Sequence, residues 1–193
     1  MQTGFIVTGA WIIFIAYWAY SAIGAKKTIG GGWRDPKGIM IRLIAAVATI
    51  VLLVLVSKGV APFGSLKPLL RVTPSPVALA IADVLVIAGI ALAIWARVHL
   101  GRNWGMPMSL KESPELVTSG PYKLIRHPIY SGMLLAFLGT AIATGLIWIL
   151  VLVWGGIYFI YSARTEEKIM ANRFPDIYPE YKQRTKMIVP FIF

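Results

Sequence analysis

The segment from Ile129 to Ser162 carries no charged side chain, and this most limits what the chain can fold into. It is too long for one membrane-spanning helix, which needs ~20 apolar residues. Thr144-Gly145 near its middle therefore predicts a tight hairpin of two short spans. Three further apolar runs each approach the length of one span: Thr3–Ile23, Ile39–Val56 and Val77–Val98. The sequence thus predicts an all-α integral membrane protein with about five transmembrane helices, the last two forming a short helical hairpin.

Composition supports a membrane protein and excludes several kinds of site. Of the 193 residues, 58% are hydrophobic and only 14% are charged, against roughly 25% charged residues in ordinary soluble proteins. The absence of cysteine excludes disulfides, thiolate nucleophiles and cysteine-ligated metals, and two histidines are too few for a histidine-rich metal site. We therefore predict no metal site. As an alternative, Thr3–Ile23 is a cleaved signal peptide, although its start lacks the usual Lys or Arg.

The basic residues, which give a formal net charge of +11, are distributed unevenly. Most fall after the first apolar run, between the third and fourth, or in the C-terminal tail: Lys26, Lys27, Arg34, Lys37, Arg42, Arg97, Arg102, Lys111, Lys123, Arg126, Arg164, Lys168, Arg173, Lys182, Arg184 and Lys186. Only Lys58, Lys67 and Arg71 fall on the other side. By the positive-inside rule, the N-terminus lies outside and the basic segments face the cytoplasm. The charge is thus explained by topology and anionic lipid head groups, and no nucleic acid partner is predicted.

Polar residues concentrate in Arg97–Tyr130 and Arg164–Thr185, which bracket the predicted hairpin. The two ends of the hairpin bring these segments together, so we predict a cofactor site at the cytoplasmic end. Such a site faces both cytosol and lipid, which suits an enzyme that joins a water-soluble donor to a lipid-soluble acceptor. We expect one membrane domain over 1–193, with scaffold spans in 1–76 and a catalytic core in 77–193 that includes the cytoplasmic loop 98–128 and the tail 163–193.

The stretch LIRHPIYSG places Arg126 and His127 directly before Pro128. Proline disfavours a helical conformation in the preceding residue and suits the first helical position, so the fourth span is predicted to begin at Pro128. Arg126 and His127 then lie beside a helix N-terminus, which favours an anion such as a carboxylate or a phosphate. The alternative is that Arg126 is a positive-inside anchor and His127 only a cap.

The stretch SARTEEKIM lies where the fifth span ends. Arg164 and Glu167 are three residues apart and share a helix face, whereas Glu166 points about 100° away from Glu167. Arg164 is expected to hold an anionic group of the substrate, and Glu167 a cation or a ribose diol. The alternative is a cluster of salt bridges that ends a membrane span.

Asp83 lies several residues inside the third apolar run. Acids within membrane spans are functional candidates by default. The predicted orientation puts Asp83 toward the outer leaflet, far from the polar segments. We therefore expect it to pack against a polar neighbour or to lie near the interface.

Four short motifs surround the hairpin: GRNW (Gly101–Trp104), LVTSGPY (Leu116–Tyr122), RHPIYSG (Arg126–Gly132) and RTEE (Arg164–Glu167), followed by the tail RFPDIYPEYKQRT (Arg173–Thr185). In this order they resemble the integral membrane methyltransferases related to isoprenylcysteine carboxyl methyltransferase and the phospholipid N-methyltransferases. The resemblance covers Val98–Pro190, about half of the chain. The family's tail commonly reads Phe-Gly where this chain has Phe174-Pro175.

The resemblance implies S-adenosylmethionine as methyl donor and a lipophilic acceptor, either an isoprenylcysteine-like carboxylate or another small lipid. It implies these donor-binding residues: Leu116, Val117, Gly120, Tyr122, Arg126, His127, Pro128, Tyr130 and Glu167. Arg164 and Glu167 would be catalytic, with Arg164 orienting the acceptor, and Asn103 and Trp104 would border the acceptor entrance. Carboxyl methylation is favoured over N-methylation, since an amine acceptor would need Glu166, Glu167 or a tyrosine as base.

Two other functions are weighed against this one. Membrane sterol-type reductases share a related RHxxY region and bind a nicotinamide cofactor, but they have more spans and differ at Glu166-Glu167. A non-enzymatic small transporter or assembly protein would carry polar residues along its spans, whereas here the polar groups lie at one end. Methyl transfer is therefore the function that the sequence favours.

Overall fold

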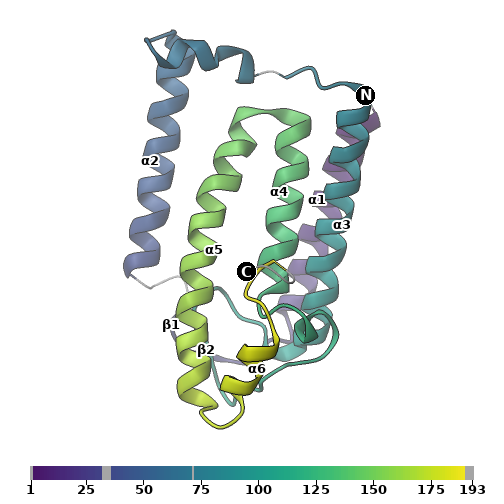
Figure 1. The fold of residues 1–193 in the computed structure, drawn as a ribbon, viewed down its shortest axis with the longest axis vertical. Coiled ribbons are helices and arrows are strands. Elements are labelled where there is room, and N and C mark those ends of the chain that lie inside the picture. Colours follow the sequence, from purple (N-terminus) through teal and green to yellow (C-terminus); the bar gives the residue numbers. More distant parts are fainter. Residues whose placement is uncertain (1, 32–35, 71, 190–193) are drawn as a thin grey trace.

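The computed structural model describes residues 2–31, 36–70 and 72–189. Its long helices run side by side: α1 (Gln2–Ala22), α2 (Pro36–Lys58), α3 (Pro76–Leu100), α4 (Pro128–Thr144) and α5 (Leu146–Arg173) (Figure 1). Among the described residues, four of these helices are long and apolar enough to cross a membrane, and α4 is a shorter apolar helix of 17 residues. The prediction of an all-α integral membrane protein with a helical hairpin is confirmed. Both spans of the hairpin were predicted to be short, but only α4 is short, since α5 has 28 residues.

The shorter elements gather mainly at the end of the bundle where α1, α3 and α5 finish (Figure 1). They are β1 (Thr28–Gly31), η3 (Gly101–Asn103), β2 (Ser109–Lys111), η4 (Gly120–Lys123) and α6 (Tyr178–Arg184), while η2 (Phe63–Leu70) lies at the opposite end. β1 and β2 pair antiparallel, with Thr28 opposite Lys111. The sequence does not predict these strands, because segments of four and three residues are too short to show an alternating pattern.

The predicted hairpin is formed by α4 and α5. α4 begins at Pro128 and ends at Thr144, and α5 begins at Leu146. Gly145 alone joins them, with a φ of 96° that glycine adopts without the clash of a Cβ atom. α5 continues to Arg173, so Glu166 and Glu167 extend from the same helix as the apolar part of the hairpin.

Glycines let the backbones of α3 and α4 approach closely. A Cβ atom built on Gly132 would lie 2.5 Å from the Gly89 carbonyl oxygen, and one built on Gly89 would lie 2.5 Å from the Gly132 carbonyl oxygen. A Cβ atom on Gly139 would lie 2.6 Å from the Ala82 carbonyl oxygen. Small residues allow this kind of contact between membrane helices. The packing positions the start of α4, where the polar segments meet, against α3.

Gly132→Ala is expected to destabilise the bundle by about 1–3 kcal/mol, because the added methyl group meets backbone atoms that cannot rotate away. Thermal unfolding of the detergent-purified protein measures this loss. Gly9→Ala in α1 is the matched control, since nothing lies within 4 Å of a Cβ atom there, and it should keep the melting temperature or raise it slightly. Equal melting temperatures for the two variants would contradict this account of the contact.

Side chains of α1 attach it to the neighbouring helices along its length. The Thr3 hydroxyl donates a hydrogen bond of 3.2 Å to Asp83 on α3, so the expected packing of Asp83 against a polar neighbour is confirmed. Further along, the Trp11 indole N–H donates to the Thr140 hydroxyl of α4 at 3.0 Å. The Trp11 ring also stacks on Phe137, with ring centroids 5.6 Å apart.

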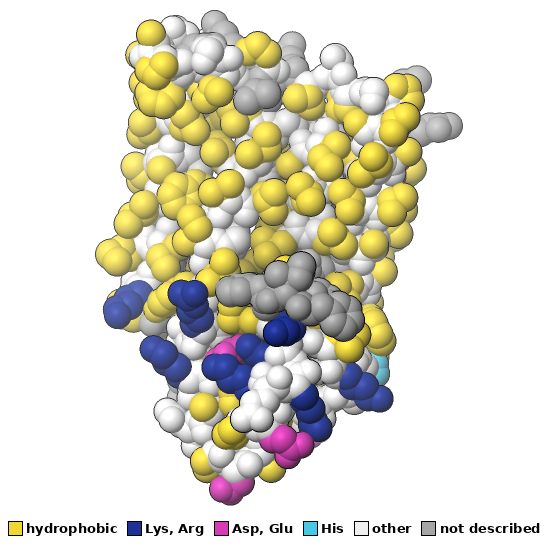
Figure 2. Space-filling model, viewed as in Figure 1, with side chains coloured by type: hydrophobic (Ala, Val, Ile, Leu, Met, Phe, Trp, Pro, Cys, Tyr) yellow, Lys and Arg dark blue, Asp and Glu magenta, His cyan; other side chains and the backbone are white. Residues whose placement is uncertain are grey.

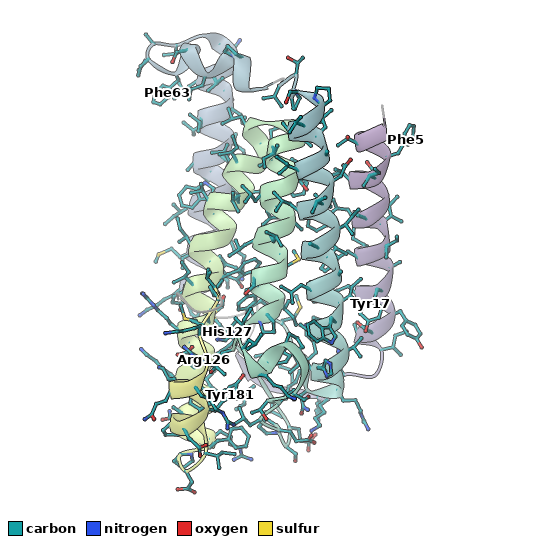
Figure 3. The ribbon with its side chains drawn as sticks, turned by 45° about the vertical axis from the view of Figure 1, so that its right-hand side comes forward. Phe5, Tyr17, Phe63, Arg126, His127 and Tyr181 are labelled. Atoms are coloured by element: carbon teal, nitrogen blue, oxygen red, sulfur yellow. The ribbon has the colours of Figure 1, made fainter. Side chains whose placement is uncertain are left out.

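Charged side chains gather at one end of the molecule, below a broad apolar belt (Figure 2). The C-terminal tail returns to the start of α4 at this end: the Arg126 N–H donates to the Lys186 carbonyl at 2.8 Å, and the His127 N–H to the Met187 carbonyl at 3.0 Å. Figure 3 shows Arg126, His127 and Tyr181 close to one another there. The two polar segments therefore meet, as predicted. Arg34 and Arg71 of the charge pattern, and Pro190 at the end of the resemblance, lie outside the described residues.

Candidate functional site

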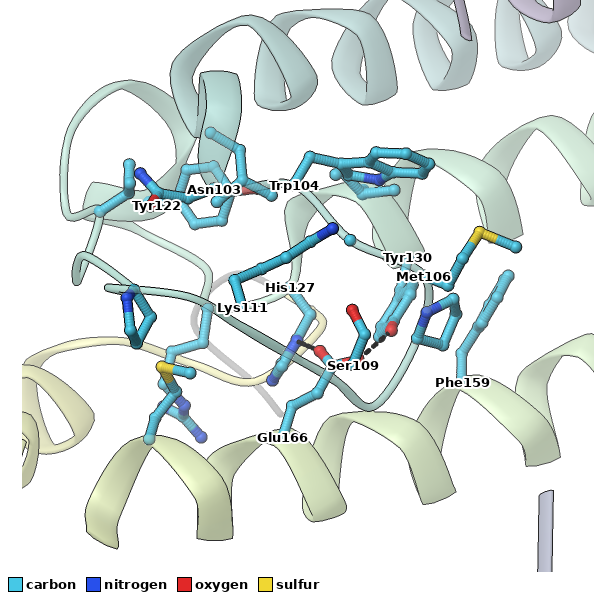
Figure 4. Close-up of a pocket in the computed structure, with 18 of the residues that line it drawn as sticks. Asn103, Trp104, Met106, Ser109, Lys111, Tyr122, His127, Tyr130, Phe159 and Glu166 are labelled. Carbon is cyan, nitrogen blue, oxygen red and sulfur yellow. Dashed lines mark hydrogen bonds and ion pairs between the residues drawn. The ribbon is translucent and has the colours of Figure 1, made fainter. Parts of the chain in front are cut away.

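A cavity of about 410 Å³ lies at the polar end of the bundle (Figure 4). This volume falls within the range of roughly 300–1,000 Å³ that is usual for small-molecule sites. The loop after α3 and the helices α4, α5 and α6 supply most of the lining, and α1 and α2 also contribute. The polar and aromatic residues of the lining include Arg42, Asn103, Trp104, Ser109, Lys111, Tyr122, Arg126, His127, Tyr130, Tyr158, Phe159 and Glu166.

Glu166 is the carboxylate of α5 that lines this cavity, and three groups hold it. The Met108 N–H donates to its Oε1 at 2.8 Å. The Tyr130 hydroxyl donates to the same oxygen at 2.5 Å, and His127 Nδ1 lies 3.4 Å from its Oε2 (Figure 4). Met108 is 2% exposed and has a φ of 62°. A non-glycine residue needs surrounding contacts to keep such a conformation. Glu166 therefore anchors the loop around Met108 to α5 and places a negative charge at the cavity.

His127 lies between the two acidic residues of α5. Its Nε2 is 3.7 Å from Glu167 Oε1 and is buried without a hydrogen-bond partner among the described residues. Burial lowers the pKa of the imidazole, but its interactions with the Glu166 and Glu167 carboxylates outweigh burial and raise the pKa above its ordinary value. The His127 ring stacks on Tyr130 at 5.4 Å, and Tyr130 stacks on Phe159 at 4.6 Å. The site thus combines an imidazole that lies between two carboxylates with a stack of aromatic rings.

The raised pKa of His127 predicts a stability that depends on pH. A group with a raised pKa in the folded state stabilises that state fully below its unfolded pKa of 6.5, and this contribution is lost as the pH rises through the folded pKa. The melting temperature of the wild type is therefore expected to fall by a few degrees from pH 6.5 upward. His127→Gln should remove this dependence and His99→Gln should retain it, as followed by thermal unfolding. A flat wild-type profile would contradict a raised pKa of His127 in the folded state.

Arg126 and Glu167 form a buried ion pair that ties the C-terminal tail to α5. Arg126 Nε lies 2.6 Å from Glu167 Oε1, and the two side chains are only 10% and 8% exposed. Arg126 Nη1 donates to the Thr185 carbonyl oxygen at 2.5 Å, and Lys182 Nζ lies 2.9 Å from Glu167 Oε2. We call these four residues the tail clasp. The clasp keeps α6, and with it Tyr178 and Tyr181, against the cavity.

Hydrogen bonds connect the loop after α1 to the loop after α3. Lys26 Nζ donates to Asn103 Oδ1 at 2.8 Å and to Glu115 Oε1 at 2.7 Å. A hydrogen bond from Lys26, which has the larger effect, and one from Asn103 hold the pKa of the Glu115 carboxyl below its usual range. Lys111 Nζ donates to the Thr28 hydroxyl at 2.9 Å. These contacts and the β1–β2 pairing close the cavity on the side of the loops.

The predicted site residues divide into two groups. The structure brings most of them together in the cavity lining: Asn103, Trp104, Leu116, Val117, Tyr122, Arg126, His127 and Tyr130. Four others do not line the cavity: Gly120, Pro128, Arg164 and Glu167. Gly120 packs against His99, Pro128 starts α4, Arg164 is exposed on α5, and Glu167 belongs to the tail clasp. The contacts of both groups with a donor or an acceptor stay predictions.

Several lining residues were not predicted. They include Ser109 and Lys111 of β2, and Phe14, Trp18 and Arg42 of α1 and α2, the helices predicted as scaffold. Arg42 had a signal in the sequence, because an arginine inside an apolar run is a functional candidate. Ser109 and Lys111 had no such signal in the sequence, because the non-local pairing of β1 with β2 determines where they lie.

Comparisons with known proteins agree with the motifs. A family described as phospholipid methyltransferase matches residues 77–177. The cobalt-zinc-cadmium resistance protein CzcN of Cupriavidus metallidurans is 36% identical over 94 residues, which are 47% of this chain and 43% of that protein. Protein-S-isoprenylcysteine O-methyltransferase B of Arabidopsis thaliana is 32% identical over 114 residues, which are 56% of this chain and 57% of that protein. A methanethiol S-methyltransferase of a Pseudomonas species is 33% identical over 81 residues, 42% and 31% of the two chains.

The chain thus spans about a third to three-fifths of the length of these relatives. Residues 77–177, which match the family, are more than half of the chain and contain almost all of α3 together with α4 and α5. They therefore include His127, Tyr130 and Glu166, the centre of the cavity lining. The resemblance seen in the sequence is confirmed, and this chain belongs to the phospholipid methyltransferase family of integral membrane proteins.

Proposed function

We propose that the protein catalyses methyl transfer from S-adenosylmethionine to a lipophilic acceptor at the membrane–cytosol interface. The observation that carries the proposal is the lining of one cavity at the end of an apolar helical bundle. The Glu166 carboxylate, the buried His127 imidazole and several aromatic rings line this cavity together. Two of the relatives are methyltransferases by name, which supports methyl transfer as the type of reaction.

The cavity lining fits the charged groups of this donor, which are a carboxylate, an ammonium and a sulfonium. Glu166 suits the ammonium group. The Nε2 of His127, which has no hydrogen-bond partner among the described residues, and the guanidinium of Arg126 suit the carboxylate. The negative charge of Glu166 in the same lining also favours a positively charged sulfur. When bound, the donor supplies a methyl group that is activated by that positive charge.

The rest of the donor is a nucleoside, and the remaining lining suits it. Leu116, Val117 and Tyr122 lie together on the loop after α3 and supply apolar and aromatic surface for adenosine. The Ser109 hydroxyl is buried without a hydrogen-bond partner among the described residues, so it suits a ribose hydroxyl. Asn103 and Trp104 remain our candidates for the border of the acceptor entrance, and Arg164 for a cation that orients the acceptor.

The protein's contributions to this reaction are alignment and the exclusion of water. A carboxylate acceptor needs no proton removed, whereas an amine acceptor needs a base at some stage. Burial raises the pKa of Tyr122, and it raises that of Tyr181 to about 12, so both phenols keep their protons at neutral pH. Glu166, a carboxylate of the cavity lining, is then our candidate for the base. We favour carboxyl methylation, because it leaves Glu166 free to hold the donor.

We also propose that the N-terminus lies outside and that the cavity faces the cytoplasm. The support is the concentration of basic side chains at the cavity end of the molecule (Figure 2). Cytoplasmic loops of membrane proteins carry an excess of Lys and Arg.

Titration of the detergent-purified protein with S-adenosylmethionine, with NADPH as the control ligand, tests the proposed function. Calorimetry is expected to detect binding of S-adenosylmethionine alone. Binding of NADPH alone would instead make the protein a reductase. Binding of neither ligand would support a protein without this enzymatic activity. Transfer of a labelled methyl group into extracted lipid would then identify the acceptor.

A further inference from the structure

Arg42 is a cation on a membrane helix that lines the same cavity as Glu166. It belongs to α2, within the apolar segment Ile39–Lys58 that is long enough to cross a membrane. Arginines near the ends of membrane helices commonly extend toward the interface, whereas the Arg42 side chain lines the cavity. The donor-binding residues proposed above do not include Arg42.

Tyr158 on α5 holds the Arg42 side chain at the cavity. Arg42 Nη1 donates a hydrogen bond of 2.8 Å to the Tyr158 hydroxyl, and its guanidinium carbon lies 5.4 Å from the centre of the Tyr158 ring. Both residues line the cavity and are half-buried. A guanidinium stays protonated and presents a planar set of N–H donors that matches a carboxylate or a phosphate. The pair is therefore suited to bind an anionic oxygen group.

The Arg42–Tyr158 pair is separated from Glu166 along the bundle. Tyr158 precedes Glu166 by eight residues of α5, roughly 12 Å at 1.5 Å per residue. Met133 of α4, Phe159 of α5 and Phe14 and Trp18 of α1 add apolar lining. The cavity thus has charged groups at two levels along the bundle, one at Glu166 and one at the Arg42–Tyr158 pair, together with apolar lining residues. An amphiphile with an anionic group matches this arrangement.

The two levels also differ in their relation to the family. His127 and Glu166 lie within the matched residues 77–177, and so does Tyr158, whereas α1 and α2, which supply Trp18 and Arg42, lie outside them. A part of the cavity that comes from outside the matched segment can differ between members without changing the donor-binding residues. This is the expected location of residues that select the acceptor.

We infer that Arg42, oriented by Tyr158, selects lipophilic acceptors that carry an anionic oxygen group, either a carboxylate or a phosphate. The inference rests on the proposed function for the presence of an acceptor. It goes further by assigning the selection of acceptor charge to a residue of α2.

Binding of three sixteen-carbon probes in maltoside micelles tests the inference: palmitate, hexadecyl phosphate and hexadecanol. Calorimetry of the wild type should show at least one anionic probe binding about 10-fold more tightly than hexadecanol, the usual effect of a hydrogen bond to a charged group. The tighter anion distinguishes a carboxylate from a phosphate acceptor. Arg42→Gln should abolish the preference, and Arg42→Lys should restore part of it. Equal affinities in the wild type, or an unchanged preference in Arg42→Gln, would overturn the inference.

Two further variants separate charge selection from loss of structure. Lys37→Gln removes a positive charge from the same helix at an exposed residue that does not line the cavity, and it should keep the preference. Tyr158→Phe keeps the ring and should reduce the preference about threefold, the cost of one weak hydrogen bond. If Arg42→Gln does not fold, an unchanged preference in Tyr158→Phe would count against the inference.

A titration of the same samples with S-adenosylmethionine keeps the two proposals apart. Retained donor affinity in Arg42→Gln, together with a lost preference for anions, supports the inference. Absence of donor binding in the wild type would remove the proposed function, while the comparison of the three probes would still decide whether Arg42 binds an anion.

Discussion

Glu166→Gln is expected to weaken S-adenosylmethionine binding by about 100-fold, or ~2.7 kcal/mol. The substitution removes the negative charge from the cavity lining but keeps an oxygen that can accept from the Met108 N–H and the Tyr130 hydroxyl. The loop around Met108 should therefore stay in place while the partner of the donor ammonium is lost. Loss of one member of a buried charge pair typically costs this much. Calorimetric titration of the purified variant measures it.

Glu180→Gln is the matched control for Glu166→Gln, because it makes the same chemical change on α6. The Glu180 side chain is 78% exposed and lies 3.5 Å from Arg184, so its loss should change donor affinity less than about twofold. Unchanged donor affinity in Glu166→Gln would remove Glu166 from the proposed donor site. A large loss in both variants would indicate an effect of net charge and not of the cavity.

Glu167→Gln, at the neighbouring residue, is expected to act on stability instead. Its carboxylate is paired with Arg126, and both side chains are almost fully buried. Removing one partner of a buried ion pair leaves the other charge uncompensated and costs about 3–5 kcal/mol. For a chain of this length, the melting temperature should fall by roughly 10 °C. Thermal unfolding measures the loss, and limited proteolysis should show earlier cleavage within the tail after α5.

Arg184→Gln is the control for this experiment, because its pair with Glu180 is exposed and should contribute little. The donor affinity of Glu167→Gln, measured below its melting temperature, distinguishes two accounts of this residue. If Glu167 contacts the donor directly, as the family resemblance implies, affinity falls sharply at an unchanged melting temperature. If it acts through the tail clasp, the melting temperature falls and affinity changes little.

Local sequence rules predicted the helical hairpin well. Pro128 fixes the start of α4, because it lacks an N–H and its φ suits the first turn, and Gly145 fixes the bend, because it tolerates a positive φ. Each rule acts within a few residues, so it can be read without knowledge of the rest of the fold. The meeting of the two polar segments followed from the hairpin, since its two ends lie on the same side.

The neighbours of individual site residues were harder to predict. Arg126 was expected to meet an anion, and its closest one is Glu167 from α5, with Thr185 of the tail beside it. Lys111 reaches the cavity lining through the pairing of β1 with β2, and Arg42 reaches it from a different helix. These contacts join residues that are far apart in the chain, and they depend on packing that no local pattern reports.

The sequence by itself determined the class of protein, its hairpin and its family, because the length of apolar runs, proline and glycine geometry and short motifs are local properties. Only the tertiary structure decided that Glu166 lines the cavity, that Glu167 clasps the tail and that Arg42 joins the site. Adjacent helical residues point about 100° apart, so the sequence requires the two glutamates to differ. Which of them lines the cavity depends on how α5 is rotated against α4 and the tail, and packing across the whole bundle sets that rotation.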